Sequence, residues 1–434
     1  MNPALIGIIG IVAMVVLLFL RVPVGFAMAI VGLAGFSYLT TPAAGFSILA
    51  QDFYTNFSSY TLTVIPLFVL MGAFASASGM SKRLYDASYS LLGTMRGGLA
   101  IATIAACAGF AAICGSTNAA SAVMGKVALP EMKRYNYNDS LATGSVASAG
   151  VLGILIPPST IFIIYGILTE QSIGKLFMAG VVPGIILTVL FVLTIAWLCW
   201  RNPALAPRGQ ATTLRQKIAG LSGLLEMAAL FVIVVVGLFL GWFSPTQAAG
   251  IGAAAALAIG LARRQIKWPA FKEAIMETLR ISCMIMVIVA GAMVFGHFLA
   301  VTRIPMELAG WIGGLPIPPA GVMGVIILMY LVFGCIMDAL ALIMLTIPII
   351  YPVVMSLGYD PIWFGVIIVL VTAMGVITPP VGINVYVVKG IAPGVPLYTI
   401  FKGIWPFLIA IVILTVLLIF VPQIVTFLPG MVSY

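Results

Sequence analysis

The sequence predicts an all-α polytopic membrane protein that contains an inverted repeat, two re-entrant hairpins and two interrupted helices. Three observations lead to this fold class. Hydrophobic residues make up 63% of the 434 residues and charged residues only 7%, whereas a soluble protein carries roughly 25% charged residues. A glycine and a proline pair interrupt two long apolar segments, at Gly153–Pro158 and at Gly375–Pro380. These segments also occupy corresponding positions in two similar halves of the chain.

The length, charge and cysteine content agree with this class. At roughly 20 residues per span, the chain has room for about ten to thirteen membrane elements. The net charge of +9 reflects bases in the loops between apolar segments, the positive-inside bias, so we expect no nucleic-acid partner. His297 is interpreted as a hydrogen-bonded packing residue rather than a proton relay. The cysteines are interpreted as small core residues, because they lie inside apolar runs without metal-ligand spacing: Cys107, Cys114, Cys199, Cys283 and Cys335.

The first 96 residues contain three predicted spans. Ala4–Leu20 is expected to be the first span rather than a cleaved signal peptide, because it has no basic leader. Val22–Leu39 is the second span, and a polar link, Thr40–Ser59, follows it. Leu62–Ser78 is the third span, and a short amphipathic stretch, Leu84–Thr94, comes next.

A re-entrant hairpin is predicted over residues 97–130. Its apolar run is broken at Gly115–Asn118, and bases flank it at Arg96 and Lys133. Bases at both ends indicate that the segment enters and leaves on one side of the membrane. A broken helix over residues 140–168 follows, because Pro157 and Pro158 remove backbone hydrogen bonds inside an apolar segment.

The second half begins after a polar linker, Arg201–Lys217. A second hairpin is predicted over residues 316–352, with Asp338 as its polar interruption. A second broken helix covers residues 362–388 and carries the second proline pair. The other predicted spans are Leu176–Trp200, Leu224–Phe243, Ala248–Ala262, Met276–Ala300 and Ile404–Phe427.

The two halves match at an offset of 222 residues. The first-half residues are Pro130, Tyr137, Gly153, Pro157, Pro158 and Ile161, and their counterparts are Pro352, Tyr359, Gly375, Pro379, Pro380 and Ile383. The loop Pro130–Arg134 carries two bases, whereas its counterpart Pro352–Ser356 carries none. Equivalent loops on opposite sides of the membrane indicate an inverted repeat. With the N-terminus periplasmic, all but three of the 20 Lys and Arg residues are cytoplasmic or next to the cytoplasm; the exceptions are Lys126, Lys175 and Arg303.

Irregular backbone at membrane depth survives only where it is buried in protein or lines a cavity, and paired interruptions of this kind indicate a transporter binding site. The first predicted ion site combines oxygen-rich segments from one hairpin and one broken helix. An alternative interpretation of the hairpin segment is a small-residue packing motif. The residues of this site are Gly115, Ser116, Thr117, Asn118, Pro157, Pro158, Ser159 and Thr160.

The second predicted ion site is centred on Asp338. An intramembrane carboxylate with no neighbouring base is costly and indicates a functional role. The alternative is a protonated or hydrogen-bonded structural aspartate. The residues that complete this site are Thr378, Pro379, Pro380, Gly382 and Asn384.

The motifs of both halves resemble those of the large, DctM-type membrane subunit of TRAP transporters, and the resemblance covers nearly the whole chain. In the first half they are Gly115-Ser116-Thr117, Pro130-Glu131-Met132, Gly153–Ser159, Gly174–Phe177, Gly180 and Pro183-Gly184. In the second half they are Met337-Asp338, Thr346-Ile347-Pro348, Gly365-Val366 and Ile377–Asn384. Their order and spacing make the match specific.

The resemblance implies a tripartite importer in the bacterial inner membrane. Its other components are a small four-helix membrane subunit and a periplasmic substrate-binding protein. The implied cargo is an organic acid, such as a C4-dicarboxylate, sialic acid or a keto acid, driven by sodium and without an organic cofactor. The family often has two serines after the first hairpin glycine; here Ser116 and Thr117 retain hydroxyls. Sodium would be held by Ser116, Thr117, Asn118, Asp338 and Thr378.

The resemblance also implies an elevator-type fold, in which a transport domain moves against a scaffold surrounded by membrane lipid. The resulting division is residues 1–60 for N-terminal scaffold spans and residues 61–200 for the first inverted repeat. Residues 201–275 form the cytoplasmic linker and further scaffold spans, and residues 276–434 the second repeat. The alternative within transport is a stand-alone sodium–carboxylate symporter. An intramembrane enzyme is disfavoured because no second catalytic group accompanies Asp338, and paired inverted breaks disfavour a channel.

Overall fold

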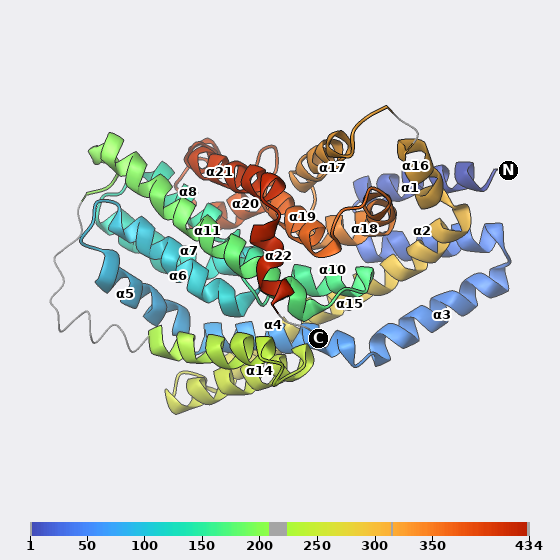
Figure 1. The fold of residues 1–434 in the computed structure, drawn as a ribbon. Coiled ribbons are helices and arrows are strands. Elements are labelled where there is room, and N and C mark those ends of the chain that lie inside the picture. The colour runs from blue at the N-terminus through green and yellow to red at the C-terminus, as the bar shows by residue number, and fades with distance from the viewer. Residues whose placement is uncertain (1, 208–223, 314–315, 432–434) are drawn as a thin grey trace.

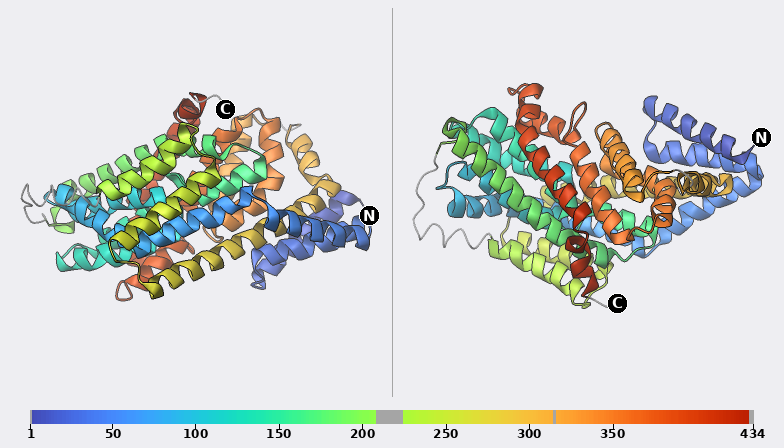
Figure 2. Two further views of the ribbon diagram at one scale, coloured as in Figure 1. Left: turned by 90° about the horizontal axis from the view of Figure 1, so that it is seen from below. Right: turned by 45° about the horizontal axis from the view of Figure 1, so that its top comes forward.

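The computed structural model describes residues 2–207, 224–313 and 316–431, and its regular elements there are all helices. The all-α prediction is confirmed. Helices α1, α2 and α3 gather at one end of the molecule, and α5, α6, α7, α8 and α11 lie at the other; the long α15 runs from the middle of the molecule toward the first end (Figure 1). Both further views keep this separation (Figure 2). Six described helices are long and apolar enough to cross a membrane, or seven if the bent pair α3–α4 is one span.

The N-terminal helices are packed against α15 through glycines on both helices. Carbon β atoms added to Gly25 and Gly32 would lie 2.9 Å and 2.8 Å from backbone atoms of α15. Such small residues let helix backbones approach closely in a membrane, where there is no hydrophobic driving force between helices. The helices of this group are α1 (Pro3–Phe19), α2 (Val24–Leu39), α3 (Pro42–Ser58) and α15 (Trp268–Thr302).

Helix α3 occupies the segment for which the sequence predicts a polar link. Thr41 caps its N-terminus, with Oγ1 accepting a hydrogen bond from the Ala44 amide at 3.2 Å. Its buried residues are Gly45, Asp52 and Asn56; Asp52 and Asn56 contact α15, and Gly45 packs against α2. Polar residues on the buried face lower the hydropathy of the segment, which is why its sequence resembles a link. His297 of α15 contacts Asp52, with 3.3 Å between Nε2 and Oδ1, and its side chain is 48% exposed.

The remaining first-half helices follow the predicted breaks closely. The segment predicted over residues 140–168 is divided into three helices, and two helices cover the predicted hairpin at residues 97–130. The elements are η1 (Thr61–Thr63), α4 (Val64–Ala77), α5 (Met80–Leu92), α6 (Gly98–Cys114), α7 (Thr117–Arg134), α8 (Asp139–Ala149), α9 (Leu152–Leu155), α10 (Thr160–Thr169), α11 (Ile173–Arg201) and η2 (Pro203–Leu205). Arg208, Arg215 and Lys217 of the predicted linker lie outside the described residues.

The second half differs from the sequence prediction at several helix boundaries, and two of these differences have a plain cause in the sequence. Helix α15 begins at Trp268 rather than Met276, because its first turns are amphipathic and not apolar. The last predicted span, Ile404–Phe427, is divided after Phe420, where Val421-Pro422 ends the helix. The elements are Leu224–Phe239, which includes η3 (Val232–Val236) and α13 (Gly237–Phe239), then α14 (Pro245–Ala262), α16 (Ile304–Gly313), α17 (Pro319–Gly334), α18 (Ala339–Ser356), α19 (Pro361–Gly375), α20 (Ile383–Ile391), α21 (Leu397–Phe420) and α22 (Gln423–Gly430).

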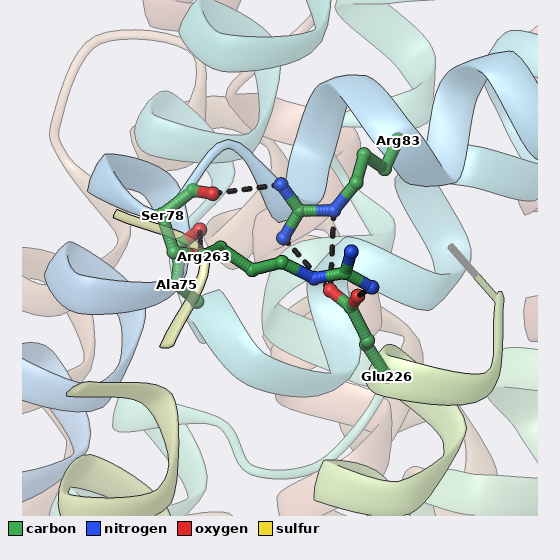
Figure 3. A network of polar contacts seen from close by, with 5 residues as sticks. All are labelled: Ala75, Ser78, Arg83, Glu226 and Arg263. Atoms are coloured by element: carbon green, nitrogen blue, oxygen red, sulfur yellow. Dashed lines mark hydrogen bonds and ion pairs between the residues drawn. The ribbon is translucent and has the colours of Figure 1, made fainter. Parts of the chain in front are cut away.

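Glu226, in the helix Leu224–Phe239, forms ion pairs with Arg83 of α5 and with Arg263 at the end of α14 (Figure 3). Its Oε2 accepts hydrogen bonds from Nε and Nη2 of Arg83, at 3.1 Å and 2.8 Å. Its Oε1 is paired with Arg263 at the end of α14. Arg83 also donates from Nη1 to the Ser78 carbonyl at 2.9 Å, which satisfies a carbonyl at the C-terminus of α4. The Glu226 side chain is only 14% exposed, so its carboxylate is largely enclosed by the chain.

Replacing Glu226 by Gln is expected to lower thermal stability by about 2 kcal/mol, between the values for exposed and buried ion pairs. The variant leaves two guanidinium groups close together with no carboxylate between them. The measurement is the thermal unfolding midpoint of the purified protein. Glu131→Gln is the matched control, because Glu131 and Arg134 are 3.9 Å apart and largely exposed. An equal midpoint for the two variants would contradict this role.

Candidate functional site

The first break in the chain lies at the turn between α6 and α7. Gly115 ends α6 with φ of +62°, a left-handed conformation that favours glycine. Ser116 is extended and caps α7, with Oγ 3.5 Å from the Ala119 amide. This hydroxyl keeps a free lone pair. The Asn118 Oδ1 atom is buried without a hydrogen-bond partner, so an unpaired oxygen lies one residue inside the helix N-terminus.

The second break, between α9 and α10, is packed directly against the first. The Gly115 carbonyl accepts hydrogen bonds from the hydroxyl and the amide of Thr160, at 2.9 Å and 3.5 Å. A carbon β on Gly153 would lie 2.6 Å from the Ser116 carbonyl oxygen, and one on Gly115 would lie 2.8 Å from the Pro158 carbonyl oxygen. The structure therefore brings the predicted first-site segments together, with backbone carbonyls and helix N-termini at one place.

In the second half, Asp338 lies at the turn between α17 and α18. It is the N-cap of α18, and its Oδ2 accepts a hydrogen bond from the Leu340 amide at 3.0 Å. Asp is among the favoured residues at this position. The carboxylate thus has local structural partners at the start of α18.

The break between α19 and α20 meets this turn through backbone contacts. A carbon β on Gly375 would lie 2.4 Å from the Gly334 carbonyl carbon, so the two helices touch through glycines. The Gly382 amide is 3.4 Å from the Cys335 carbonyl oxygen. Gly382 has φ of +61° and stands at the start of α20. Thr378 donates its hydroxyl to the Met374 carbonyl at 2.6 Å, which leaves the oxygen lone pairs free.

The two pairs of breaks differ in burial. Pro157, Pro158, Ser159 and Thr160 are buried, whereas Pro379 and Pro380 are exposed and Thr378 and Asp338 are intermediate. Both Pro-Pro peptide bonds are cis. The second pair of breaks is therefore less enclosed by the chain than the first.

Asn384 connects the two halves and does not simply extend the second site. Its amide nitrogen Nδ2 donates to the Ala147 carbonyl at the end of α8, at 3.2 Å. Its backbone amide donates to the Val376 carbonyl at 3.1 Å. Its Oδ1 is buried without a partner. Asn384 thus lies between the first and the second breaks.

Three residues near Asn384 were not selected from the sequence. Carbon β on Gly150 would meet Ser121 Oγ, the Thr117 carbonyl and Asn384 Nδ2, so these groups surround one glycine. Ser121 and Ser148 are fully buried, and their hydroxyls have no hydrogen-bond partner. Ser121 is one helical turn after Thr117, and this i, i+4 spacing is the signal that could have identified it.

The oxygen atoms at the first pair of breaks fit a hard cation. Such cations bind carbonyl, hydroxyl and amide oxygens, and an unpartnered buried oxygen otherwise costs about 1–3 kcal/mol. Asn118 Oδ1 is such an atom, two residues after Ser116 in the same helix N-terminal turn. Among the residues with described placement, no group of three or more His, Cys, Asp or Glu side chains could hold a metal ion. Neutral oxygen donors of this kind suit a monovalent cation.

The family model of the tripartite ATP-independent periplasmic transporter DctM component matches residues 11–424. The chain belongs to the DctM family. This chain is 36% identical over 383 residues to the C4-dicarboxylate TRAP transporter large permease DctM of Pseudomonas aeruginosa, covering 88% of this chain and 89% of that one. It is 32% identical to the sialic acid TRAP transporter large permease SiaM of Vibrio cholerae, covering 95% of this chain and 96% of that one.

The fold of this DctM-family chain also resembles a solved transporter. The crystal structure of the Alcanivorax borkumensis YdaH transporter matches with a TM-score of 0.59 at 17% identity, covering 87% of this chain and 88% of that chain. At this identity the likeness concerns the fold alone. Family membership and the apolar helices identify the DctM-family chain as a multi-pass membrane protein of a transporter, and its relatives are permeases rather than enzymes.

Proposed function

We propose that this chain is the large permease subunit of a tripartite importer that moves small organic acids inward with sodium. The observation that carries the proposal is the packing of each hairpin turn against a helix break, in a member of this family. The relatives are named for C4-dicarboxylates and for sialic acid, which share a carboxylate. Its partners would be the small four-helix membrane subunit and a periplasmic binding protein.

The first sodium ion would use Ser116, Thr117 and Asn118, which follow the Gly115 turn that packs against the α9–α10 break. The second would use Asp338 and Thr378, with Gly382 at the facing helix terminus. A substrate carboxylate would be attracted to the helix N-termini at these breaks, which carry partial positive charge. The substrate anion would then be bound by helix N-termini at the breaks and not by Lys or Arg side chains.

An elevator movement would carry both pairs of breaks across the membrane as one body. The moving part would contain the hairpins of residues 97–130 and 316–352 and the broken helices of residues 140–168 and 362–388. Helices α1, α2 and α14, with the long α15, would form the scaffold. The N-terminus would be periplasmic and the protein would reside in the inner membrane. The scaffold would then include the start of the second repeat, because α15 crosses the boundary at residue 276.

Uptake of labelled organic acids into proteoliposomes tests the proposal. The chain is reconstituted alone, with the small subunit, and with the small subunit plus the binding protein, under an inward sodium gradient or an equal potassium gradient. We expect uptake only with all three components and sodium. Sodium-driven uptake by this chain alone would replace the tripartite model by a stand-alone symporter. Equal uptake under the potassium gradient would show that transport is not coupled to sodium.

Asn118→Ala is expected to raise the half-maximal sodium concentration for uptake by about tenfold or more, equivalent to the loss of one oxygen contact of roughly 1.4 kcal/mol. The substitution removes a buried oxygen that has no partner within the protein, so it should not lower the thermal midpoint in sodium-free buffer. Ser58→Ala is a control, because its exposed hydroxyl donates to carbonyls of its own helix. An unchanged sodium requirement with Asn118→Ala would exclude Asn118 as a ligand.

A further inference from the structure

A groove of about 390 Å³ runs between α11 and α21, outside the site described above. The chain leaves α11 toward the linker at the end where it enters α21 (Figure 1), so the two helices are antiparallel. Phe191 and Phe407 form the contact behind the groove, with ring centroids 5.4 Å apart. The lining residues are Leu190, Leu193, Thr194, Trp197, Trp405, Pro406, Ile409, Ala410 and Ile413.

The groove is apolar along its length. The exposed fraction is 57% for both Leu193 and Ile409, on opposite walls. The one hydroxyl in the lining, that of Thr194, donates to the Leu190 carbonyl at 2.7 Å. It therefore offers no unpaired donor to a ligand. A hydrocarbon chain is the kind of occupant that such a surface accepts at little cost.

At one end of the groove, two basic residues lie on the same helix faces as the lining residues. Arg201 follows Trp197 by four residues and Lys402 precedes Trp405 by three, so each base lies on the groove-facing stripe of its helix. The Arg201 guanidinium carbon lies 5.5 Å from the centre of the Trp197 ring. Both bases are exposed. In the part of the chain that the structure describes, neither forms an ion pair.

The exposed tryptophans locate this end of the groove at a membrane surface. Trp197 and Trp405 are 50% and 54% exposed and lie one turn from the bases, on the hydrocarbon side of them. Tryptophans collect at the level of lipid headgroups, and bases on the cytoplasmic side attract anionic lipids. The loops at this end carry the cytoplasmic bases of the predicted topology.

We propose that the α11–α21 groove binds one anionic phospholipid of the cytoplasmic leaflet. Its phosphate lies between Arg201 and Lys402, and one acyl chain fills the groove past Trp197 and Trp405. A surface that merely faces bulk lipid needs neither a concave lining nor two unpaired bases aligned with it. The combination of shape, apolar lining and charge at one end selects a phospholipid over a free anion or a protein helix.

Photo-crosslinking in nanodiscs tests this site independently of transport. The full chain is reconstituted with phosphatidylglycerol or phosphatidylcholine that carries a diazirine in one acyl chain, and crosslinked peptides are identified by mass spectrometry. We expect labelling of Leu190–Trp197 and Trp405–Ile413 with the anionic lipid, and excess unlabelled phosphatidylglycerol should compete better than phosphatidylcholine. Labelling elsewhere but not on these peptides would overturn the proposal.

Different substitutions test the contribution of the lipid headgroup and that of the acyl chain. Arg201→Gln with Lys402→Gln is expected to reduce phosphatidylglycerol labelling of the groove by roughly tenfold or more, because each base contributes to anionic-lipid attraction. Lys133→Gln with Arg134→Gln removes two exposed bases at the end of α7 and should change nothing. Thr194→Phe fills the groove and should reduce labelling by both lipids. Equal labelling by both lipids in the unmodified protein would overturn the anionic selectivity.

Discussion

Gly375→Ala is expected to reduce sodium-driven uptake by at least about tenfold and to destabilise the protein by about 1–3 kcal/mol, the usual cost of overpacking a filled interface. The added carbon would lie 2.4 Å from the Gly334 carbonyl carbon and 2.5 Å from its α carbon. Backbone atoms cannot move aside as a flexible side chain can. Helices α17 and α19 must therefore separate, and the Cys335–Asp338 turn moves away from Gly382.

The predicted loss of stability is opposite in sign to the usual effect of replacing a helical Gly by Ala. In a helix interior, Ala is otherwise more favourable than Gly by about 1 kcal/mol. Gly324 is the matched control, because it is in α17 and no atom lies within 4 Å of an added carbon β. We expect Gly324→Ala to keep uptake and to leave the thermal midpoint unchanged or higher. A Gly375→Ala protein with normal uptake and midpoint would show that the α17–α19 contact does not position the site.

Asp338→Asn is expected to lower uptake by at least about tenfold while leaving thermal stability within about 0.5 kcal/mol, because Asn is as good an N-cap as Asp. The side chain keeps an oxygen for the Leu340 amide, now 3.0 Å from Oδ2. Only the charge is lost. Uptake is measured against sodium concentration in proteoliposomes, and the unfolding midpoint is measured on the same preparations.

Asp360→Asn is the control for a capping aspartate outside the breaks. Asp360 caps α19, with Oδ1 accepting from the Trp363 amide at 2.7 Å. Its variant should transport normally. If Asp338→Asn also transports normally at all sodium concentrations, the carboxylate is a helix cap and not a sodium ligand. That is the structural alternative that the sequence left open.

Much of the architecture could be predicted from the chain, because the physical signals are local. A Pro-Pro pair in an apolar segment must interrupt the helix, and the divisions at residues 157–158 and 379–380 follow from it. Apolar length predicts the helices, and Gly115 ends α6 in a conformation that suits glycine. Family motifs gave the permease assignment. Helix α3 is not apparent as an apolar run, because Asp52 and Asn56 on its buried face lower the hydropathy of the segment.

Only the tertiary structure decided how the local features meet. It placed the Gly115 turn against Thr160, and it directed Asn384 across to Ala147 rather than toward Asp338. It also assigned Asp338 a capping partner and paired Glu226 with two arginines. These contacts join residues far apart in the chain, and helix packing sets them through backbone approach at glycines. The sequence by itself determined where the helices break and which oxygens the breaks carry; the fold determined which of those oxygens lie together.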